Sequence, residues 1–240
     1  MAEIRVIPIC NAGVILYLQG LCIWVDVLNR ENAGGYDVLS EEAFECLLGE
    51  PEFRPDAILF THRHADHYSE ERLFKAVEAF PEAKVFVGGG RPSSQCIALP
   101  SSAGSVRLRV LPLPHAGEAY QDVENDALFL ESMDGNVLFA GDCPVACPEL
   151  FYALKALESV ENASVGVDLA FFNFPWLSLG KGRKALSQMA PGHVLFFHLP
   201  SWENDLFHYR EQAERMLERY GDGRDFRIAG EPFSEEIFVL

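Results

Sequence analysis

Basic residues and long apolar runs are both scarce in this sequence. Its 240 residues include 19 Lys and Arg against 36 Asp and Glu, which gives a formal net charge of −17. A chain of this charge repels the phosphates of nucleic acids and anionic lipid surfaces, so neither is an expected partner. The sequence also has no apolar run of about 18 residues, the length that predicts a transmembrane helix. These features leave a homo-oligomer open.

The cysteines do not form the close, regular pattern of a disulfide framework. They are spread along the chain and lie mostly in apolar stretches, which predicts buried free thiols in a reducing compartment. Cys143 and Cys147 form one close pair, but the sequence has no second pair to complete a zinc finger. The first residues lack the basic start and apolar core of a secretory signal. We therefore expect a cytoplasmic protein.

A histidine-rich segment stands out at residues 61–67. Four side chains of the kinds that bind metal ions fall within six residues of it: His62, His64, Asp66 and His67. The segment follows the apolar stretch 57–60, which is typical of a buried strand, and precedes Ser69, a candidate helix N-cap. It is therefore predicted to be a strand-to-helix loop, where α/β sheets usually carry their chemistry. Because imidazole and carboxylate are common metal ligands, the segment predicts a metal site.

The order His62-x-His64-x-Asp66-His67 resembles the H-x-H-x-D-H signature of the metallo-β-lactamase superfamily. The resemblance implies three further ligands, each at or just after a strand end. The sequence has a suitable residue at each of these places: His115, Asp142 and His198. His193 opens the same predicted strand that His198 closes, so these two histidines are not expected to share a site. The resemblance covers nearly the whole chain.

The resemblance also implies how the ligands divide between two divalent metal ions. The first ion would take His62, His64 and His115, the second would take Asp66, His67 and His198, and Asp142 would bridge the two ions. Asp66 would also orient the attacking water, which makes it the expected catalytic residue. Ligation by His and Asp alone favours zinc, and manganese or iron is also permitted.

One further carboxylate is expected to serve the same site. Asp26 follows the apolar stretch 21–25, and a carboxylate at the end of a buried strand usually accepts hydrogen bonds. The resemblance implies that Asp26 supports the histidine loop from behind the metal ligands. The alternative is an Asp that simply initiates a turn.

The implied fold is a four-layer αββα sandwich of the α/β (α+β) class, with residues 1–240 in a single domain. Sequence patterns predict strands at 4–7, 14–18, 21–25, 57–60, 85–87, 106–110, 127–130, 137–140, 165–172, 194–197, 226–228 and 237–239. They predict helices at 41–48, 69–80, 148–159 and 204–220. In the second helix, Leu73, Val77 and Phe80 are expected to share one face, with Phe74 beside them. The Ser- and Pro-rich stretch 91–105 is expected to link the two halves.

The expected chemistry follows from two metal ions a few ångström apart. Such a pair lowers the pKa of a shared water toward roughly 7 and polarises the oxygen of the bond under attack. The predicted function is hydrolysis of a small-molecule ester, lactone or phosphodiester, and the sequence most resembles the lactonase-like, stand-alone hydrolases of the superfamily. Two alternatives stay open: a mononuclear iron dioxygenase acting on a thiol persulfide, and a non-catalytic metal-binding protein.

A second segment is a candidate for substrate binding. Residues 173–180 form an aromatic stretch that contains Trp176 and follows a predicted strand. Lys181 and Arg183 come next, in the densest basic cluster of an acidic chain. These side chains could line a pocket and hold an acidic group of the substrate. The alternative is that the basic residues belong to a solvated helix start.

Overall fold

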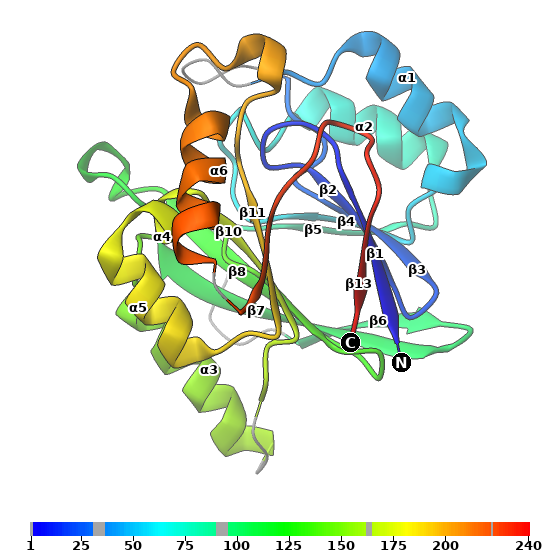
Figure 1. The fold of residues 1–240 in the computed structure, drawn as a ribbon. Coiled ribbons are helices and arrows are strands. Elements are labelled where there is room, and N and C mark those ends of the chain that lie inside the picture. The colour runs from blue at the N-terminus through cyan, green and yellow to red at the C-terminus, as the bar shows by residue number, and fades with distance from the viewer. Residues whose placement is uncertain (1, 31–36, 90–95, 162–164, 222) are drawn as a thin grey trace.

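Two mixed β-sheets pack face to face in the computed structural model, and helices cover their outer sides (Figure 1). The structure describes residues 2–30, 37–89, 96–161, 165–221 and 223–240. The strand order of one sheet is β13-β1-β2-β3-β4-β5, and that of the other is β12-β11-β10-β9-β8-β7-β6. No helix among these residues has the length and apolar character needed to cross a membrane.

The first sheet consists of β1 (Glu3–Pro8), β2 (Val14–Leu18), β3 (Leu21–Val25), β4 (Ala57–Phe60), β5 (Lys84–Val87) and β13 (Glu236–Val239). The second consists of β6 (Cys96–Ser101), β7 (Gly104–Pro114), β8 (Glu124–Glu131), β9 (Asn136–Phe139), β10 (Leu169–Asn173), β11 (His193–Phe197) and β12 (Asp225–Ile228). The helices are α1 (Glu41–Gly49), α2 (Glu70–Ala79), α3 (Pro148–Glu161), α4 (Pro175–Ser178), α5 (Gly180–Met189) and α6 (Tyr209–Tyr220). Short 3-10 helices lie at η1 (Pro51–Phe53), η2 (Glu118–Tyr120) and η3 (Trp202–Asn204).

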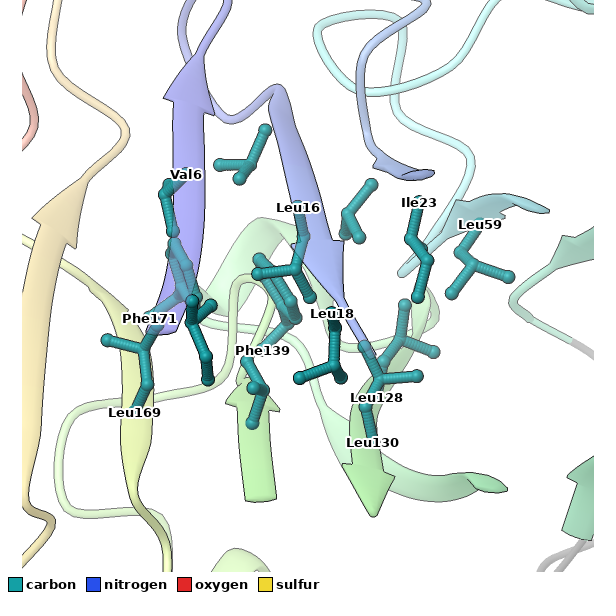
Figure 2. Close-up of a cluster of buried hydrophobic side chains, with 14 of the residues drawn as sticks. Val6, Leu16, Leu18, Ile23, Leu59, Leu128, Leu130, Phe139, Leu169 and Phe171 are labelled. Carbon is teal, nitrogen blue, oxygen red and sulfur yellow. The ribbon is translucent and has the colours of Figure 1, made fainter. Parts of the chain in front are cut away.

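The core between the sheets is built by alternate residues of their strands, because successive side chains of a strand point to opposite faces. Leu16 and Leu18 of the first sheet face Leu128 and Phe139 of the second (Figure 2). Phe139 also stacks on Phe171, with 4.0 Å between the ring centroids and 12° between the planes. This central cluster joins the two sheets into one packed unit.

The opposite residues of the same strands pack outward against the helices. Trp24 and Phe60 of the first sheet lie with Phe44 of α1 in one buried cluster. Phe172 and Phe196 of the second sheet lie in another, to which α3, α4, α5 and α6 contribute. Three stacked apolar interfaces therefore separate four layers, and the expected αββα sandwich is confirmed.

The local helix signals also agree with the structure. The hydroxyl of Ser40 accepts a hydrogen bond from the backbone N–H of Ala43 at the start of α1. The hydroxyl of Ser69 accepts one from Arg72 at the start of α2. Both are N-caps of the expected kind, since the cap oxygen satisfies a backbone donor that the helix leaves free.

Two local expectations were incomplete. The stretch 91–105 connects the two sheets as expected, but its described part also contains β6, which pairs antiparallel with β7. Pro100 fits within β6 because the strand lies at the edge of its sheet, where one side needs no backbone donor. On α2 and at its C-cap, Leu73 and Phe80 pack in one apolar cluster, whereas Val77 is exposed and Arg72 and Ala76 are buried.

The topology brings several strand ends to one edge of the sandwich. β3 and β4 are parallel, as are β9, β10 and β11. β7 runs in the same direction as β9, because both are antiparallel to β8. The loops that follow β4, β7, β9 and β11 therefore leave their sheets at the same edge, and these loops carry all seven of the predicted metal ligands.

The stacked rings of the central core predict a large stability effect. Phe171 is fully buried, so Phe171→Ala should lower the free energy of unfolding by about 3–5 kcal/mol through lost burial and the cavity left behind. Phe74→Ala is the matched control, because Phe74 on α2 is 65% exposed and its loss should cost roughly 0.5 kcal/mol or less. Urea unfolding of both variants measures the difference. Equal losses would contradict this assignment of the core.

Candidate metal centre

Seven side chains from four loops meet at this edge of the sandwich. They form three overlapping groups, in each of which the candidate ligand atoms all lie within 4.8 Å of one another. The groups are His62, His64 and His115; His62, His67 and Asp142; and Asp66, His67 and His198. The first and third of these are the two ligand sets that the sequence resemblance implies.

The first group consists of three imidazoles. The ring centroids of His62 and His115 lie 4.8 Å and 4.6 Å, respectively, from that of His64. The Nδ1 of His115 donates a hydrogen bond to the carbonyl of Ala116 at 2.7 Å, which leaves Nε2 as its free ligand atom. The Nε2 atoms of His62 and His115 are buried and have no hydrogen-bond partner within the part of the chain that is described. Because buried polar atoms are nearly always paired, these two nitrogens fit a bound metal ion.

The group formed by Asp66, His67 and His198 combines a carboxylate with two imidazoles. The Nε2 atoms of His67 and His198 lie 3.2 Å apart. The Oδ2 atom of Asp66 lies 3.6 Å from the Nε2 of His198. The side-chain amide of Asn11 donates to the backbone carbonyl of Asp66 at 3.3 Å and approaches its carboxylate at 3.5 Å. Asn11 therefore holds the Asp66 segment beside β11.

The carboxylate of Asp142 lies between the group of His62, His64 and His115 and the group of Asp66, His67 and His198. Its Oδ2 atom is 3.5 Å from the Nε2 of His115 and 3.7 Å from the Nε2 of His67. Its Oδ1 atom is 3.7 Å from the Nε2 of His198. A carboxylate that faces histidines of both groups is placed as a bridging ligand needs to be.

Asp26 fixes the orientation of two ligand imidazoles. Its carboxylate accepts hydrogen bonds from the backbone N–H of Thr61 at 2.8 Å, the hydroxyl of Thr61 at 2.7 Å and the Nδ1 of His67 at 3.0 Å. Since the Thr61 hydroxyl gives its hydrogen to Asp26, its oxygen accepts from the Nδ1 of His62, 2.9 Å away. Both imidazoles therefore turn their Nε2 atoms toward the site. Partners of this kind set the tautomer and basicity of metal-binding histidines.

A second clamp holds the turn that carries Asp142. Gly141 has a φ of +57°, and a Cβ there would clash with Oδ1 of Asn125 and crowd Thr61. The same Asn125 oxygen accepts a hydrogen bond from the backbone N–H of Asp142 at 3.0 Å. Three residues that support the ligands were not predicted from the sequence: Thr61, Asn125 and Asn11. Thr61 had a local signal, since it directly precedes His62, whereas the two asparagines lie far in the sequence from the aspartates that they contact.

The electrostatics of the site favour a bound cation. Burial and the neighbouring His67 hold the pKa of His62 far below its usual range, so this imidazole is neutral. Burial alone would lower the pKa of His67, but the carboxylates of Asp142 and Asp26 outweigh it and raise that pKa well above its usual value. Burial would raise the pKa of Asp142, but His198 and His67 hold it well below its usual range. Positive charge is thus stabilised around His67 and Asp142, where the two sets of candidate ligands meet.

The candidate substrate residues are not brought into these groups. Residues 175–178 form α4, and Trp176 is fully buried against Phe172, with 4.2 Å between the ring centroids. Arg183 donates to the carbonyls of Leu177 and Ser178, while Lys181 lies exposed near the start of α5. A tryptophan that packs a helix onto a sheet and one that lines a pocket look alike in sequence.

His193 lies at the opposite end of β11 from His198, as expected. Its Nδ1 donates to Asp225 at 2.7 Å, and Arg227 contacts the same carboxylate. This His–Asp pair resembles the pairing of His67 with Asp26 but is remote from the ligand groups along the strand. It therefore offers a matched control for experiments on the metal centre.

Comparisons with known proteins establish the fold. No family model and no curated protein matches the sequence. Igni18, a metallo hydrolase from Ignicoccus hospitalis, has a similar structure at 15% identity, with a TM-score of 0.62 and 99% of each chain covered. The metallo-β-lactamase fold protein YhfI from Bacillus subtilis is similar at 12% identity and TM-score 0.57, over 99% of this chain and 100% of its own. CmlA, a diiron β-hydroxylase from Streptomyces venezuelae, is similar at 16% identity and TM-score 0.59, over 100% of this chain and 55% of its own. The chain thus has the metallo-β-lactamase fold.

The Asp26 network predicts a loss of metal affinity without a loss of fold. Asp26 has a φ of +53°, a conformation that asparagine tolerates, so Asp26→Asn should keep the turn. An amide cannot accept hydrogen bonds at both of its heavy atoms, so His67 and Thr61 lose their shared acceptor. Zinc affinity should fall about 10- to 100-fold, measured by competition with a chromophoric chelator. Asp225→Asn, at the far end of β11, should bind zinc like the unaltered protein. Unchanged affinity in Asp26→Asn would show that the network does not support the ligands.

Proposed function

We propose that this protein is a metal-dependent hydrolase that uses two divalent metal ions to cleave a small-molecule ester, lactone or phosphodiester. The observation that carries the proposal is the carboxylate of Asp142, which faces histidines of both ligand groups at 3.5–3.7 Å. A bridging carboxylate between two complete sets of ligands is what a two-metal site requires. The metallo-β-lactamase fold, shared with the metallo hydrolase Igni18, supports the same reading.

The residues divide by their position in the two groups. His62, His64 and His115 would hold the first ion, and Asp66, His67 and His198 would hold the second, with Asp142 shared. Imidazole and carboxylate ligands suit zinc and permit manganese or iron. Two ions bound here supply a hydroxide at neutral pH and polarise the oxygen of the bond under attack.

The protein's own side chains would orient the metal ligands and the attacking water. Asp26 and Thr61 hold the imidazoles of His62 and His67 before any substrate arrives, which removes their reorientation from the reaction. Asn11 donates a hydrogen bond to the backbone carbonyl of Asp66, and the Asp66 carboxylate faces His198. In this proposal Asp66 would orient the attacking water, in addition to ligating the second ion.

An iron-dependent oxygenase is the second candidate. The same fold occurs in CmlA, which is described as a diiron β-hydroxylase, so the fold alone does not choose between hydrolysis and oxidation. A mononuclear iron dioxygenase would leave part of the seven-ligand set unused, which counts against it. A non-catalytic metal-binding protein is the third candidate, and metal-loaded protein without activity on a lactone, ester and phosphodiester panel would favour it.

Metal content is the first test of the proposal. Protein purified without added metal should carry about two zinc or manganese ions per chain by elemental analysis, and should hydrolyse members of a lactone, ester and phosphodiester panel. Iron in place of zinc, together with oxygen consumption, would favour the oxygenase. Little metal even after reconstitution would show that the seven side chains do not bind together.

A single ligand substitution tests the division of the groups. His64→Ala should remove about one metal ion per chain and abolish hydrolysis, because the first ion would keep only His62 and His115 besides the shared Asp142. His208→Asn is the control, since His208 lies exposed before α6 in a left-handed conformation that asparagine accepts. This variant should keep both metal content and activity. Full activity in His64→Ala would overturn the assignment of the site.

A further inference from the structure

Tyr120 is an aromatic side chain at the metal centre that no ligand set includes. It ends η2, a few residues after His115. Its ring centroid lies 5.1 Å from the ring of His64 and 5.2 Å from that of His115, in edge contact with both. The tyrosine thus rests on two of the three imidazoles of the first ligand group.

The four rings place Tyr120 on the outer side of that group. His62 contacts the rings of both His64 and His115 from the protein side, and it is 0% exposed. Tyr120 contacts the same two rings and is 47% exposed. His62 and Tyr120 therefore occupy the inner and outer corners of one cluster. The exposed part of the tyrosine therefore faces solvent next to the first ligand group.

The backbone holds this ring in place. Gly117 has a φ of +97°, and a Cβ there would lie 3.0 Å from Cδ2 of Tyr120, so a larger residue would press on the ring. The backbone N–H of Tyr120 donates to the carbonyl of Gly117 at 3.1 Å, and that of Val123 donates to the carbonyl of Tyr120 at 3.0 Å. A half-exposed tyrosine that is fixed in this way offers rigid apolar surface at little entropic cost.

The residues that flank Tyr120 in the sequence carry charges of one sign. Glu118, Asp122 and Glu124 lie within four residues of it, and the sequence from 115 to 131 contains no Lys or Arg. The segments 141–150 and 198–209, which carry Asp142 and His198, also contain none. Arg63 is the cation within the histidine loop, and its guanidinium packs over the ring of Tyr68 at 5.7 Å. Acidic loops of this kind weaken the attraction of bound metal ions for an anionic group and leave a neutral group unaffected.

These observations point to the substrate class, and the inference rests on the proposed function. We propose that Tyr120 is the specificity-determining residue of the first metal group, contacting an uncharged aromatic or apolar group next to the reacting carbon. Among the substrates that the metal centre can serve, this selects uncharged esters and lactones over phosphodiesters. Tyr120 acts through contact with the substrate and leaves the ligands themselves unchanged.

Thiols bound to cobalt-substituted protein test this contact without any turnover. A thiolate that binds cobalt gives a charge-transfer band, so its dissociation constant can be read from the spectrum and expressed per thiolate, which removes the different acidities of the three thiols from the comparison. Benzyl mercaptan should bind about tenfold more tightly than ethanethiol, because its ring packs on Tyr120. Sodium 2-mercaptoethanesulfonate should bind more weakly than ethanethiol because of the acidic loops. Tyr120→Ala should abolish the preference for the benzyl group, while Tyr120→Phe should retain it.

The controls separate this inference from the proposed function. Tyr152→Ala, which removes a tyrosine that is 73% exposed on α3, should leave all three dissociation constants unchanged. If cobalt does not bind, or no thiol gives a charge-transfer band, the metal centre itself fails. If thiols bind but show no benzyl preference, or if Tyr120→Ala weakens all three equally, the role of Tyr120 is overturned and the metal centre stands. Tighter binding of the sulfonate than of ethanethiol would overturn the selection for uncharged substrates.

Discussion

The metal centre depends on the carboxylate of Asp26. Three donors converge on it, and through the hydroxyl of Thr61 it controls His62 as well as His67. Because Asp26 directly follows β3 and Thr61 directly follows β4, these hydrogen bonds also fix how two parallel strands finish at the sheet edge. A buried carboxylate is unfavourable unless it is fully hydrogen-bonded. The side chains of Asp26, Thr61, His62 and His67 therefore form one network in which each hydrogen bond stabilises the others. Two ligand imidazoles are thereby oriented before a metal ion binds.

The rest of the fold supplies rigidity and direction. Four loops reach one edge because the strands before them run the same way, and the packed interface between the sheets keeps those strand ends together. The centre contains several carboxylates and imidazoles with little exposure to water, where unpaired charge is unstable. Asp142 and His67 offset each other's charge in the protein alone. Divalent ions at the candidate centre would satisfy the same carboxylates while also engaging the Nε2 atoms of His62 and His115.

Sequence reasoning found the layers of the fold and the residues that now meet at the centre, because both depend on local signals. Strand alternation, Ser40 and Ser69 as caps, and a histidine-rich segment after a strand can each be recognised within a few residues. The errors arose where a contact joins distant segments. The exposure of Val77 depends on how α2 is rotated on its sheet, and the burial of Trp176 depends on the packing of α4. Asn125 was missed for the same reason, since only the pairing of β8 with β9 brings it to Asp142.

The inner and outer corners of the first ligand group are held by different means. His62 is tied through Thr61 to Asp26 and is enclosed by the core, so a change there disturbs metal binding and the strand ends together. Tyr120 is held by Gly117 and by edge contacts with two imidazoles, and it lies on a loop that belongs to neither sheet. The ring contacts of Tyr120 can therefore change without loss of the hydrogen bonds that hold His62. A fold arranged in this way can keep one metal centre while its outer loops adapt to different substrates.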